Sequence, residues 1–343
     1  MRDFQLKLVS NPRDPKVSSP DFTIQLSYPE PGIARLHYDR VKRGNALSPE
    51  AYQALREAFE ELAEDKRSQV ILFTTEGDHF GGGADLRFLL TLKNPEAARA
   101  FSTFINRVAL RIQEVAFRKP ILTVIPKRIQ GGMSHLAMAT NRLVVGDESE
   151  VLREPGFFHF KILAGGGGIT RLVRHLADYE FVSKDEKERI RFAMQEAFRI
   201  LVLDSGKFMS GQEVVQKGLA MAAVSLNGLM DHALLLAREM KMRPQDFTVM
   251  HRAKMQYPYD RVIVEAVESD LLKQIGSHPS LSLDLERSVA VSIVTLMAKA
   301  LIEPLGEETI QTESALFAPL FFQADAPSRI RTFLDEIKRT KQK

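Results

Sequence analysis

The feature that most constrains the fold is a repeated order of short buried strand, glycine-rich loop and helix. Residues 70–75 form the apolar run VILFTT, which lacks the alternation of a strand with one solvated face. The loop EGDHFGGG and the helical pattern ADLRFLLTL follow it, and the same order returns as ILTVI, the pair Gly131-Gly132 and MSHLAMATN. Short buried strands that alternate with helices predict an α/β fold with crossover connections.

Other segments of the chain carry clear periodic patterns. IARLHYD at 33–39 alternates as a half-buried strand does, and Ser48-Pro49-Glu50 is typical of a helix start, which predicts a helix through about residue 64. RLVVGD at 142–147 predicts another strand. A helix is expected to begin after the glycine run 165–168, and SKDEKERIRFAMQEAFRILV predicts an amphipathic helix.

We divide the chain into three segments. Residues 1–27 combine several prolines with scattered charge, which predicts an N-terminal arm. Residues 28–239 form the expected α/β core, and residues 240–343 the expected C-terminal helical region, with an oligomerisation role. Within that last region, residues 241–305, which include MQYPYDR, are expected to reshape a pocket or the oligomer contact. The plainer alternative is an extended trimerisation helix with a connecting loop.

Composition excludes several classes of protein. The chain has no cysteine, which excludes disulfide scaffolds, thiolate metal sites and a cysteine nucleophile. It has 47 Lys and Arg against 44 Asp and Glu, so a net charge of +3 gives no support for a nucleic-acid partner. No apolar run has the length of a membrane span, and the first residues lack the apolar stretch of a secretory signal. We therefore expect a cytoplasmic protein without a membrane partner.

The glycine clusters do not match a nucleotide-binding fingerprint. Gly81-Gly82-Gly83 fails the GxGxxG pattern at Leu86, and Gly165 to Gly168 fails it at Thr170. Ordinary turns explain a single glycine cluster. Two clusters that each lie between a buried strand and a helix start predict a binding site, because each offers a free amide near the positive end of a helix dipole. Two such amides can hold one oxygen as an oxyanion hole does, and a thioester carbonyl is a natural occupant.

Four motifs together resemble a known family. They are RVKRGNALS (40–48), GDHFGGGADLRFL (77–89), RKPILTVIPKRIQGGMSHLAMATNRLVVGDES (118–149) and AGGGGITRL (164–172). In order and spacing they resemble the enoyl-CoA hydratase/isomerase, or crotonase, superfamily. The resemblance covers about residues 22–224, and FAPLFFQADAPSRIRTFLDEIK near the C-terminus is also similar.

This resemblance implies a spiral of repeated ββα units that binds an acyl-CoA, with no covalently bound cofactor, because coenzyme A arrives as part of the substrate. The amides that hold the thioester oxygen would belong to Ala84 and Gly132. A C-terminal helix that reaches a neighbour's coenzyme A implies a homotrimer or hexamer. The family's coenzyme A contacts would fall on Lys42, Arg43, Ala46, Gly82, Asp85, Leu86, Phe333 and Lys338.

Two departures from the family pattern matter for function. Family hydratases place one catalytic glutamate three residues after the second glycine, where this chain has His135. They place another in a Pro-Glu before the glycine-rich helix, and here Phe157 occupies that position. A water molecule held between two carboxylates therefore cannot be activated in the usual way, which disfavours simple hydration.

Several polar residues have both a functional and a structural interpretation. His135 is either a general acid or base beside the amides or one more polar side chain on a helix. Glu154 either turns into the site from its loop or stays a solvated surface charge, and Asp85 either contacts coenzyme A or caps a helix. The remaining histidines show no metal-binding spacing.

We carry two hypotheses from different classes. The first is an acyl-CoA-transforming enzyme that stabilises a thioester enolate and moves protons with His135 or a loop carboxylate. Its expected outcomes are isomerisation, dehydration or hydrolytic or lyase-type cleavage of a carbon-carbon bond. The second is a noncatalytic acyl-CoA-binding or assembly subunit that kept the pocket and lost the chemistry.

Overall fold

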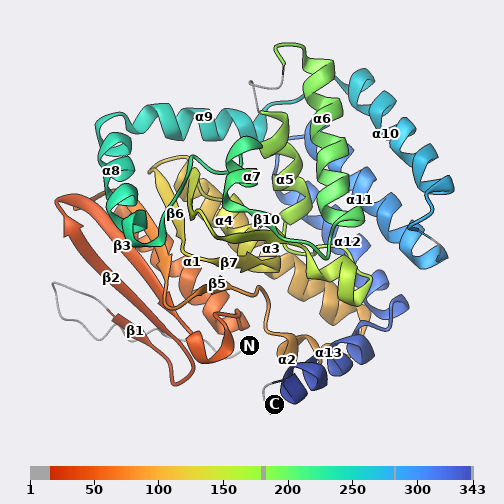
Figure 1. Cartoon of the computed structure of the whole chain (residues 1–343), viewed down its shortest axis with the longest axis horizontal. Helices are drawn as coiled ribbons and strands as arrows, with labels where there is room; N and C mark the ends of the chain where they lie inside the picture. The colour runs from red at the N-terminus through yellow and green to blue at the C-terminus, as the bar shows by residue number, and fades with distance from the viewer. Residues whose placement is uncertain (1–15, 179–182, 282, 341–343) are drawn as a thin grey trace.

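The computed structural model describes residues 16–178, 183–281 and 283–340. Their order is strand-rich in the first half and helical after residue 225, and the C-terminal helices fold back beside the sheets (Figure 1). The predicted α/β class is therefore confirmed. The first fifteen residues of the expected arm lie outside the described residues.

Two sheets build the core of the described chain. The larger one has seven strands in the order β1-β2-β3-β4-β6-β8-β11, and the smaller one four in the order β10-β9-β7-β5. From β3 to β11 the large sheet is parallel, whereas β1, β2 and β3 pair antiparallel. The strands are β1 (Lys16–Ser18), β2 (Thr23–Glu30), β3 (Gly32–Asp39), β4 (Ser68–Thr75), β5 (His79–Gly81), β6 (Ile121–Ile125), β7 (Arg128–Gln130), β8 (Arg142–Gly146), β9 (Glu150–Arg153), β10 (Met209–Ser210) and β11 (Ala222–Val224).

The strands are arranged as a spiral of ββα units. Strands β4, β6 and β8 lie in sequence order in the large sheet, and each is followed by β5, β7 or β9 in the small sheet. A helix then crosses back to the next strand of the large sheet. This confirms the crotonase-like spiral that the motifs predict. The helices are α1 (Pro49–Glu64), α2 (Leu86–Leu89), α3 (Pro95–Ala116), α4 (Gly131–Met138), α5 (Gly168–Ala177), α6 (Glu186–Phe198), α7 (Gly211–Gln216), α8 (Leu229–Met242), α9 (Pro244–Gln256), α10 (Arg261–Ser277), α11 (Asp284–Ile302), α12 (Glu307–Gln323) and α13 (Ala326–Thr340).

The central strands of the large sheet, β4 and β6, are buried on both faces, which explains why they are apolar without alternation. In β4, Ile71 and Phe73 face the main core, while Val70 and Leu72 pack against α8. Ile33, the one apolar residue on the otherwise polar face of β3, also packs in the α8 cluster. Helix α1 begins as predicted, because Ser48 accepts a hydrogen bond from the amide of Ala51.

Two sequence predictions need correction. Residues 16–27 were expected to belong to an arm, but β1 and most of β2 form there because Thr23 to Ser27 pair with β3. The helix expected at ADLRFLLTL is only the single turn α2, which Asp85 caps by accepting a hydrogen bond from the amide of Arg87. The boundary expected at residue 240 stays a prediction, since α8 ends at Met242 and α9 begins directly after it.

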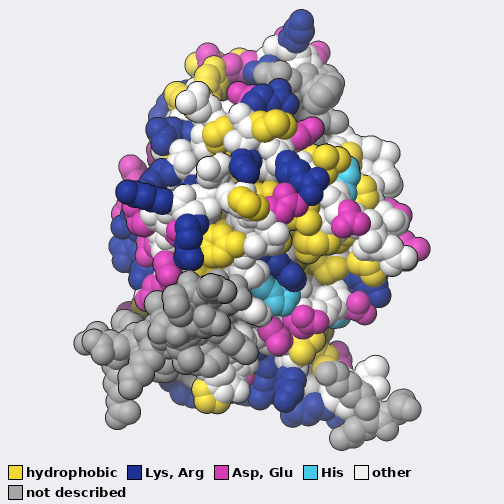
Figure 2. Space-filling view, turned by 90° about the vertical axis from the view of Figure 1, so that its left-hand side faces the viewer, with side chains coloured by type: hydrophobic (Ala, Val, Ile, Leu, Met, Phe, Trp, Pro, Cys, Tyr) yellow, Lys and Arg dark blue, Asp and Glu magenta, His cyan; other side chains and the backbone are white. Residues whose placement is uncertain are grey.

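The exposed surface shows no single-sign charge field on the side formed by the N-terminal strands and α8. Lys and Arg side chains alternate there with acidic and apolar ones in the described part of that face (Figure 2). None of the described helices combines the length and apolarity needed to span a bilayer. In the segment expected either to reshape a pocket or to connect helices, Asp260 caps α10 and Tyr257 packs on Tyr259.

One buried arginine joins the spiral to the C-terminal helices. Arg174 on α5 is fully buried and donates to the backbone oxygens of Lys254 at 2.9 Å, Tyr257 at 2.8 Å and Glu303 at 2.6 Å. Burial lowers its pKa to about 10, so it is still a cation at neutral pH. The three carbonyls lie at the C-terminal ends of α9 and α11.

We predict that Arg174→Met lowers the free energy of unfolding by about 3 kcal/mol or more, because three buried carbonyls lose their donor. Urea denaturation of the full chain measures the effect. Arg191→Met, at an exposed position on α6, is the matched control and should stay within about 0.5 kcal/mol of the wild type. A similar small change for Arg174→Met would contradict this role.

Candidate active site

Two glycine loops meet where β5 and β7 end. Gly83 has a φ of +89° and Gly131 a φ of +52°, conformations that favour glycine. A Cβ on Gly83 would collide with the backbone nitrogen of Gly132. The two loops can therefore touch only because both lack side chains at the contact, and this contact brings Ala84 and Gly132 together.

The amides of Ala84 and Gly132 have no hydrogen-bond acceptor within the described chain. The neighbours of Ala84 are engaged with Leu47, because the oxygen of Gly83 accepts from the Leu47 amide and the Asp85 amide donates to the Leu47 oxygen. Gly132 lies in the first turn of α4, where amides have no intrahelical partner. Both residues are partly exposed while Gly83 and Met133 beside them are buried, so solvent or a ligand reaches this point.

A third donor that sequence reasoning missed lies at the same point. The position that a Cβ on Gly132 would occupy is 2.5 Å from the hydroxyl oxygen of Tyr52 and 3.3 Å from the nitrogen of Ala84. Tyr52, on α1, is 1% exposed, and its hydroxyl has no hydrogen-bond partner among the described residues. Burial raises the pKa of this hydroxyl, so it keeps its proton. In the sequence, Tyr52 is only one member of the buried stripe of a helix.

The structure brings His135 and Glu154 together. His135 lies one turn after Gly132 on α4, and its Nε2 is 3.1 Å from the Glu154 carboxylate. The two side chains are 5% and 10% exposed, so this pair is buried. The other carboxylate oxygen of Glu154 accepts from the amide of Gly156 at 3.3 Å. Glu154 is therefore not a solvated surface charge, while the catalytic roles of both residues stay predictions.

The glycine run 165–168 makes room for the imidazole ring. A Cβ on Gly166 would lie 2.7 Å from Nδ1 of His135, and one on Gly168 would overlap the other side of the ring. Nδ1 itself is buried and has no hydrogen-bond partner in the described chain. The run thus serves a histidine and not a phosphate, which agrees with its failure to match a nucleotide fingerprint.

A buried carboxyl group from the C-terminal helices completes this polar centre. Glu313 on α12 is 1% exposed and accepts from the amide of Gly167 at 2.6 Å and from Asn106 at 3.3 Å. Burial raises its pKa, and the nearby His135 and Arg171 oppose that rise. Sequence reasoning missed Glu313 because nothing in the pattern of α12 distinguishes it from the other glutamates of that helix, Glu307 and Glu308.

The expected coenzyme A residues fall into two groups. The loop that carries Lys42, Arg43 and Ala46 contacts the first glycine loop, because the amide of Gly82 donates to the oxygen of Gly44 at 3.2 Å. Lys42 and Arg43 are exposed, whereas Ala46, Gly82 and Leu86 are partly exposed.

Asp85 has a structural role in addition to its predicted contact with coenzyme A. It pairs with the buried Arg40 at 2.9 Å and caps α2. The structural interpretation of Asp85 as a helix cap is therefore correct, and its contact with coenzyme A stays a prediction.

The C-terminal members of the expected set lie on α13. Phe333 packs against His159 and Phe160 of the π-helical turn η2 (Gly156–Phe160), which directly follows Glu154 and Pro155. Lys338 is exposed and pairs with Asp335 at 3.1 Å. Phe157, at the position of the family's second glutamate, is buried in the core. No group of three His, Asp or Glu side chains suited to a metal ion occurs among the described residues.

Comparisons with known proteins agree with the spiral and its motifs. The sequence profile of the enoyl-CoA hydratase/isomerase family matches residues 29–181. The chain is 24% identical over 229 residues to a probable mitochondrial enoyl-CoA hydratase 2 of Arabidopsis thaliana, covering 65% of this chain and 68% of the relative. It is 25% identical over 264 residues to the fatty acid oxidation complex subunit alpha of Shewanella amazonensis, covering 75% of this chain but only 35% of that relative.

Solved structures show the same fold at low sequence identity. An enoyl-CoA hydratase from Bacillus anthracis matches with a TM-score of 0.55 and 19% identity over 78% of this chain and 90% of that one. An enoyl-CoA hydratase from Polaromonas sp. JS666 matches with a TM-score of 0.56 and 20% identity over 75% and 92%. The profile match over residues 29–181, the relatives and the ββα spiral together support membership of the enoyl-CoA hydratase/isomerase (crotonase) superfamily, whose fold this chain shares.

Proposed function

We propose that this protein is an acyl-CoA-transforming enzyme that holds a thioester oxygen with the amides of Ala84 and Gly132 and forms an enolate there. The observation that carries the proposal is the meeting of two free amides with the buried hydroxyl of Tyr52 at one partly exposed point. Fixed donors aimed at a carbonyl oxygen stabilise the charge that develops on it. Tyr52 adds a third donor to the two that the sequence predicts.

In the proposed reaction a base removes a proton from the α-carbon of the acyl group. The electron pair of the C–H bond forms the carbon-carbon double bond of the enolate, and the carbonyl pair moves onto the oxygen. That oxygen then carries the negative charge that the three donors stabilise. Reprotonation at another carbon gives isomerisation, and loss of a β-hydroxyl gives dehydration. In carbon-carbon cleavage the enolate is instead the product: water, losing a proton to the base, adds to a β-keto group, the bond between the α- and β-carbons breaks, and its electron pair forms the enolate, which then takes a proton at the α-carbon.

The His135–Glu154 pair is the proposed proton-transfer unit. When Nε2 donates its proton to Glu154, the tautomer is set and Nδ1 keeps a lone pair. A carboxylate behind a histidine also stabilises the imidazolium that forms when the ring takes a proton. Simple hydration is disfavoured, because family hydratases use two glutamates where this chain has His135 and Phe157.

The remaining parts of the proposal rest on the family resemblance. They are coenzyme A as part of the substrate, contacts of Lys42 and Arg43 with it, a homotrimer or hexamer, and a cytoplasmic location. The alternative is a noncatalytic acyl-CoA-binding or assembly subunit, which the departures at both glutamate positions favour. Measurements of α-proton exchange and of acyl-CoA binding distinguish the enzyme from the noncatalytic subunit.

We predict that the full chain exchanges the α-protons of a bound acyl-CoA for deuterium in deuterium oxide. Mass spectrometry of the thioester measures this exchange. His135→Gln should slow this exchange by about 10²- to 10⁴-fold, because the proton acceptor is lost. Glu154→Gln should also slow it, since the amide can donate to Nε2 and favour the wrong tautomer. His232→Gln, on α8, is the matched control.

Two outcomes contradict this assignment. Unchanged exchange by His135→Gln would remove His135 from the mechanism. Binding of acyl-CoA in calorimetry without exchange of any substrate, in a panel of saturated, unsaturated and β-keto thioesters, would favour the noncatalytic alternative. Absence of binding would exclude both hypotheses.

We predict opposite effects of Tyr52→Phe on activity and stability. Removal of a buried hydroxyl that has no partner should raise the free energy of unfolding by about 1 kcal/mol. Removal of an oxyanion donor should slow α-proton exchange by about 100-fold. Urea denaturation and the exchange assay measure the two effects.

The control for this variant is Tyr28→Phe, which loses a hydrogen bond to Asp65 at a site far along the large sheet. It should leave exchange unchanged. A Tyr52→Phe variant that keeps full exchange, or that is less stable than the wild type, would show that the hydroxyl only fills space.

A further inference from the structure

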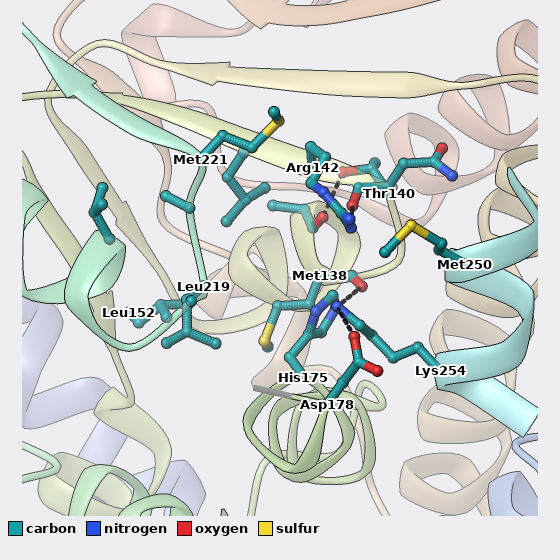
Figure 3. Close-up of a pocket in the computed structure, with 16 residues that line it drawn as sticks. Met138, Thr140, Arg142, Leu152, His175, Asp178, Leu219, Met221, Met250 and Lys254 are labelled. Atoms are coloured by element: carbon teal, nitrogen blue, oxygen red, sulfur yellow. Dashed lines mark hydrogen bonds and ion pairs between the residues drawn. The ribbon is translucent and has the colours of Figure 1, made fainter. Parts of the chain in front are cut away.

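A separate cavity of about 470 Å³ lies at the other end of α4 (Figure 3). The last turn of α4, the start of β8, the end of α5, the loop between α7 and β11, and α9 enclose it. The amide of Gly132 lies in the first turn of α4, about 9 Å away along a helix that rises about 1.5 Å per residue. None of the residues proposed for catalysis lines this cavity.

Two cations and one carboxylate face this cavity. Lys254 on α9 pairs with Asp178 at 3.0 Å, so the charge of Lys254 is neutralised. Arg142, at the start of β8, donates to the backbone oxygen of Asn141 at 2.9 Å, and no carboxylate of the described residues lies within 4.0 Å of it. Figure 3 shows the side chains of Arg142, Lys254 and Asp178 converging from three different elements.

His175, which lines the cavity, and His251 beside it carry no charge that would offset or add to that of Arg142. His175 is buried and its Nε2 contacts the backbone oxygen of Met138 at 2.8 Å. His251, packed beside it, contacts the oxygen of Ala139 at 3.2 Å. Burial lowers the pKa of both rings well below the usual range, so both are neutral at pH 7. Among the described lining residues, Arg142, Lys254 and Asp178 together carry a surplus of one positive charge, that of Arg142.

Apolar side chains form much of the remaining cavity wall. They come from α4, β9, the loop before β11 and α9, and are Met138, Leu152, Leu219, Met221 and Met250. Methionines adapt their shape to an apolar ligand. A partly buried guanidinium without a carboxylate, next to an apolar wall, matches a ligand with an anionic head and an apolar body.

We propose that this cavity is a second binding site, distinct from the acyl-CoA site, which takes a small monocarboxylic acid with its carboxylate on Arg142 and its alkyl chain against Met138, Leu219 and Met221. A carboxylate supplies the charged partner that Arg142 lacks, in a geometry that permits two parallel hydrogen bonds. The cavity has the size of ordinary small-molecule sites.

Calorimetry of the full chain with hexanoate tests the proposal, with hexanol and hexylamine as probes of the same length. We expect hexanoate to bind, about tenfold more tightly than butanoate because two more CH₂ groups are buried, and hexylamine not to bind. Arg142→Met should weaken hexanoate binding tenfold or more and leave hexanol binding unchanged. Arg191→Met, at an exposed position, is the matched control.

A cavity-filling variant and a competition experiment locate the site. Met221→Trp should abolish hexanoate binding while α-proton exchange of acyl-CoA persists. Hexanoate binding that Arg142→Met leaves unchanged would overturn the proposal, and so would complete displacement of hexanoate by a saturating acyl-CoA. A third contrary result is a wild-type protein that does not bind hexanoate, together with a Met221→Trp variant that no longer self-associates. The last result would identify the cavity as a contact between two copies of the chain.

Discussion

The site depends on the direct contact between two glycine loops. A Cβ on Gly83 would lie 2.4 Å from the backbone nitrogen of Gly132, so a side chain on Gly83 would push the loops apart. The ββα spiral creates this contact, because β5 and β7 are parallel neighbours in the small sheet and each leads into one of the loops. Free backbone amides are thus placed by sheet register, and no flexible side chain has to be ordered to form them.

The polar centre behind the loops is held by packing from distant parts of the chain. Helix α12 brings Glu313 onto the amide of Gly167, and the same glycine run leaves space for the ring of His135. The unpartnered hydroxyl of Tyr52 and the unpartnered Nδ1 of His135 are both costly when buried. A protein that keeps such groups at one site sacrifices stability there, as functional sites commonly do.

Local signals in the sequence predicted an α/β fold with glycine loops between strands and helices, because such loops are short-range features. The spiral, and Ala84 and Gly132 as the residues that supply the two amides, came from the family resemblance. The helix cap at Ser48 and the buried run of β4 were predictable for the same reason. Tyr52 and Glu313 were not, since each lies in a helix whose pattern shows only that a residue is buried. Helix packing decides which buried residue meets a glycine loop. Tyr52 and Gly132 are separated by more than 75 residues of chain, and periodicity does not encode a contact over that distance.

The central claim is that Ala84, Gly132 and Tyr52 hold the oxygen of a thioester. Infrared difference spectroscopy of a bound acyl-CoA, labelled with ¹³C at the thioester carbonyl, tests it most directly. Strong donors weaken the carbonyl bond, so the account predicts a shift of its stretch to lower frequency on binding, which Tyr52→Phe reduces. A bound thioester whose stretch stays at its value in water, in the wild type and the variant alike, would contradict it.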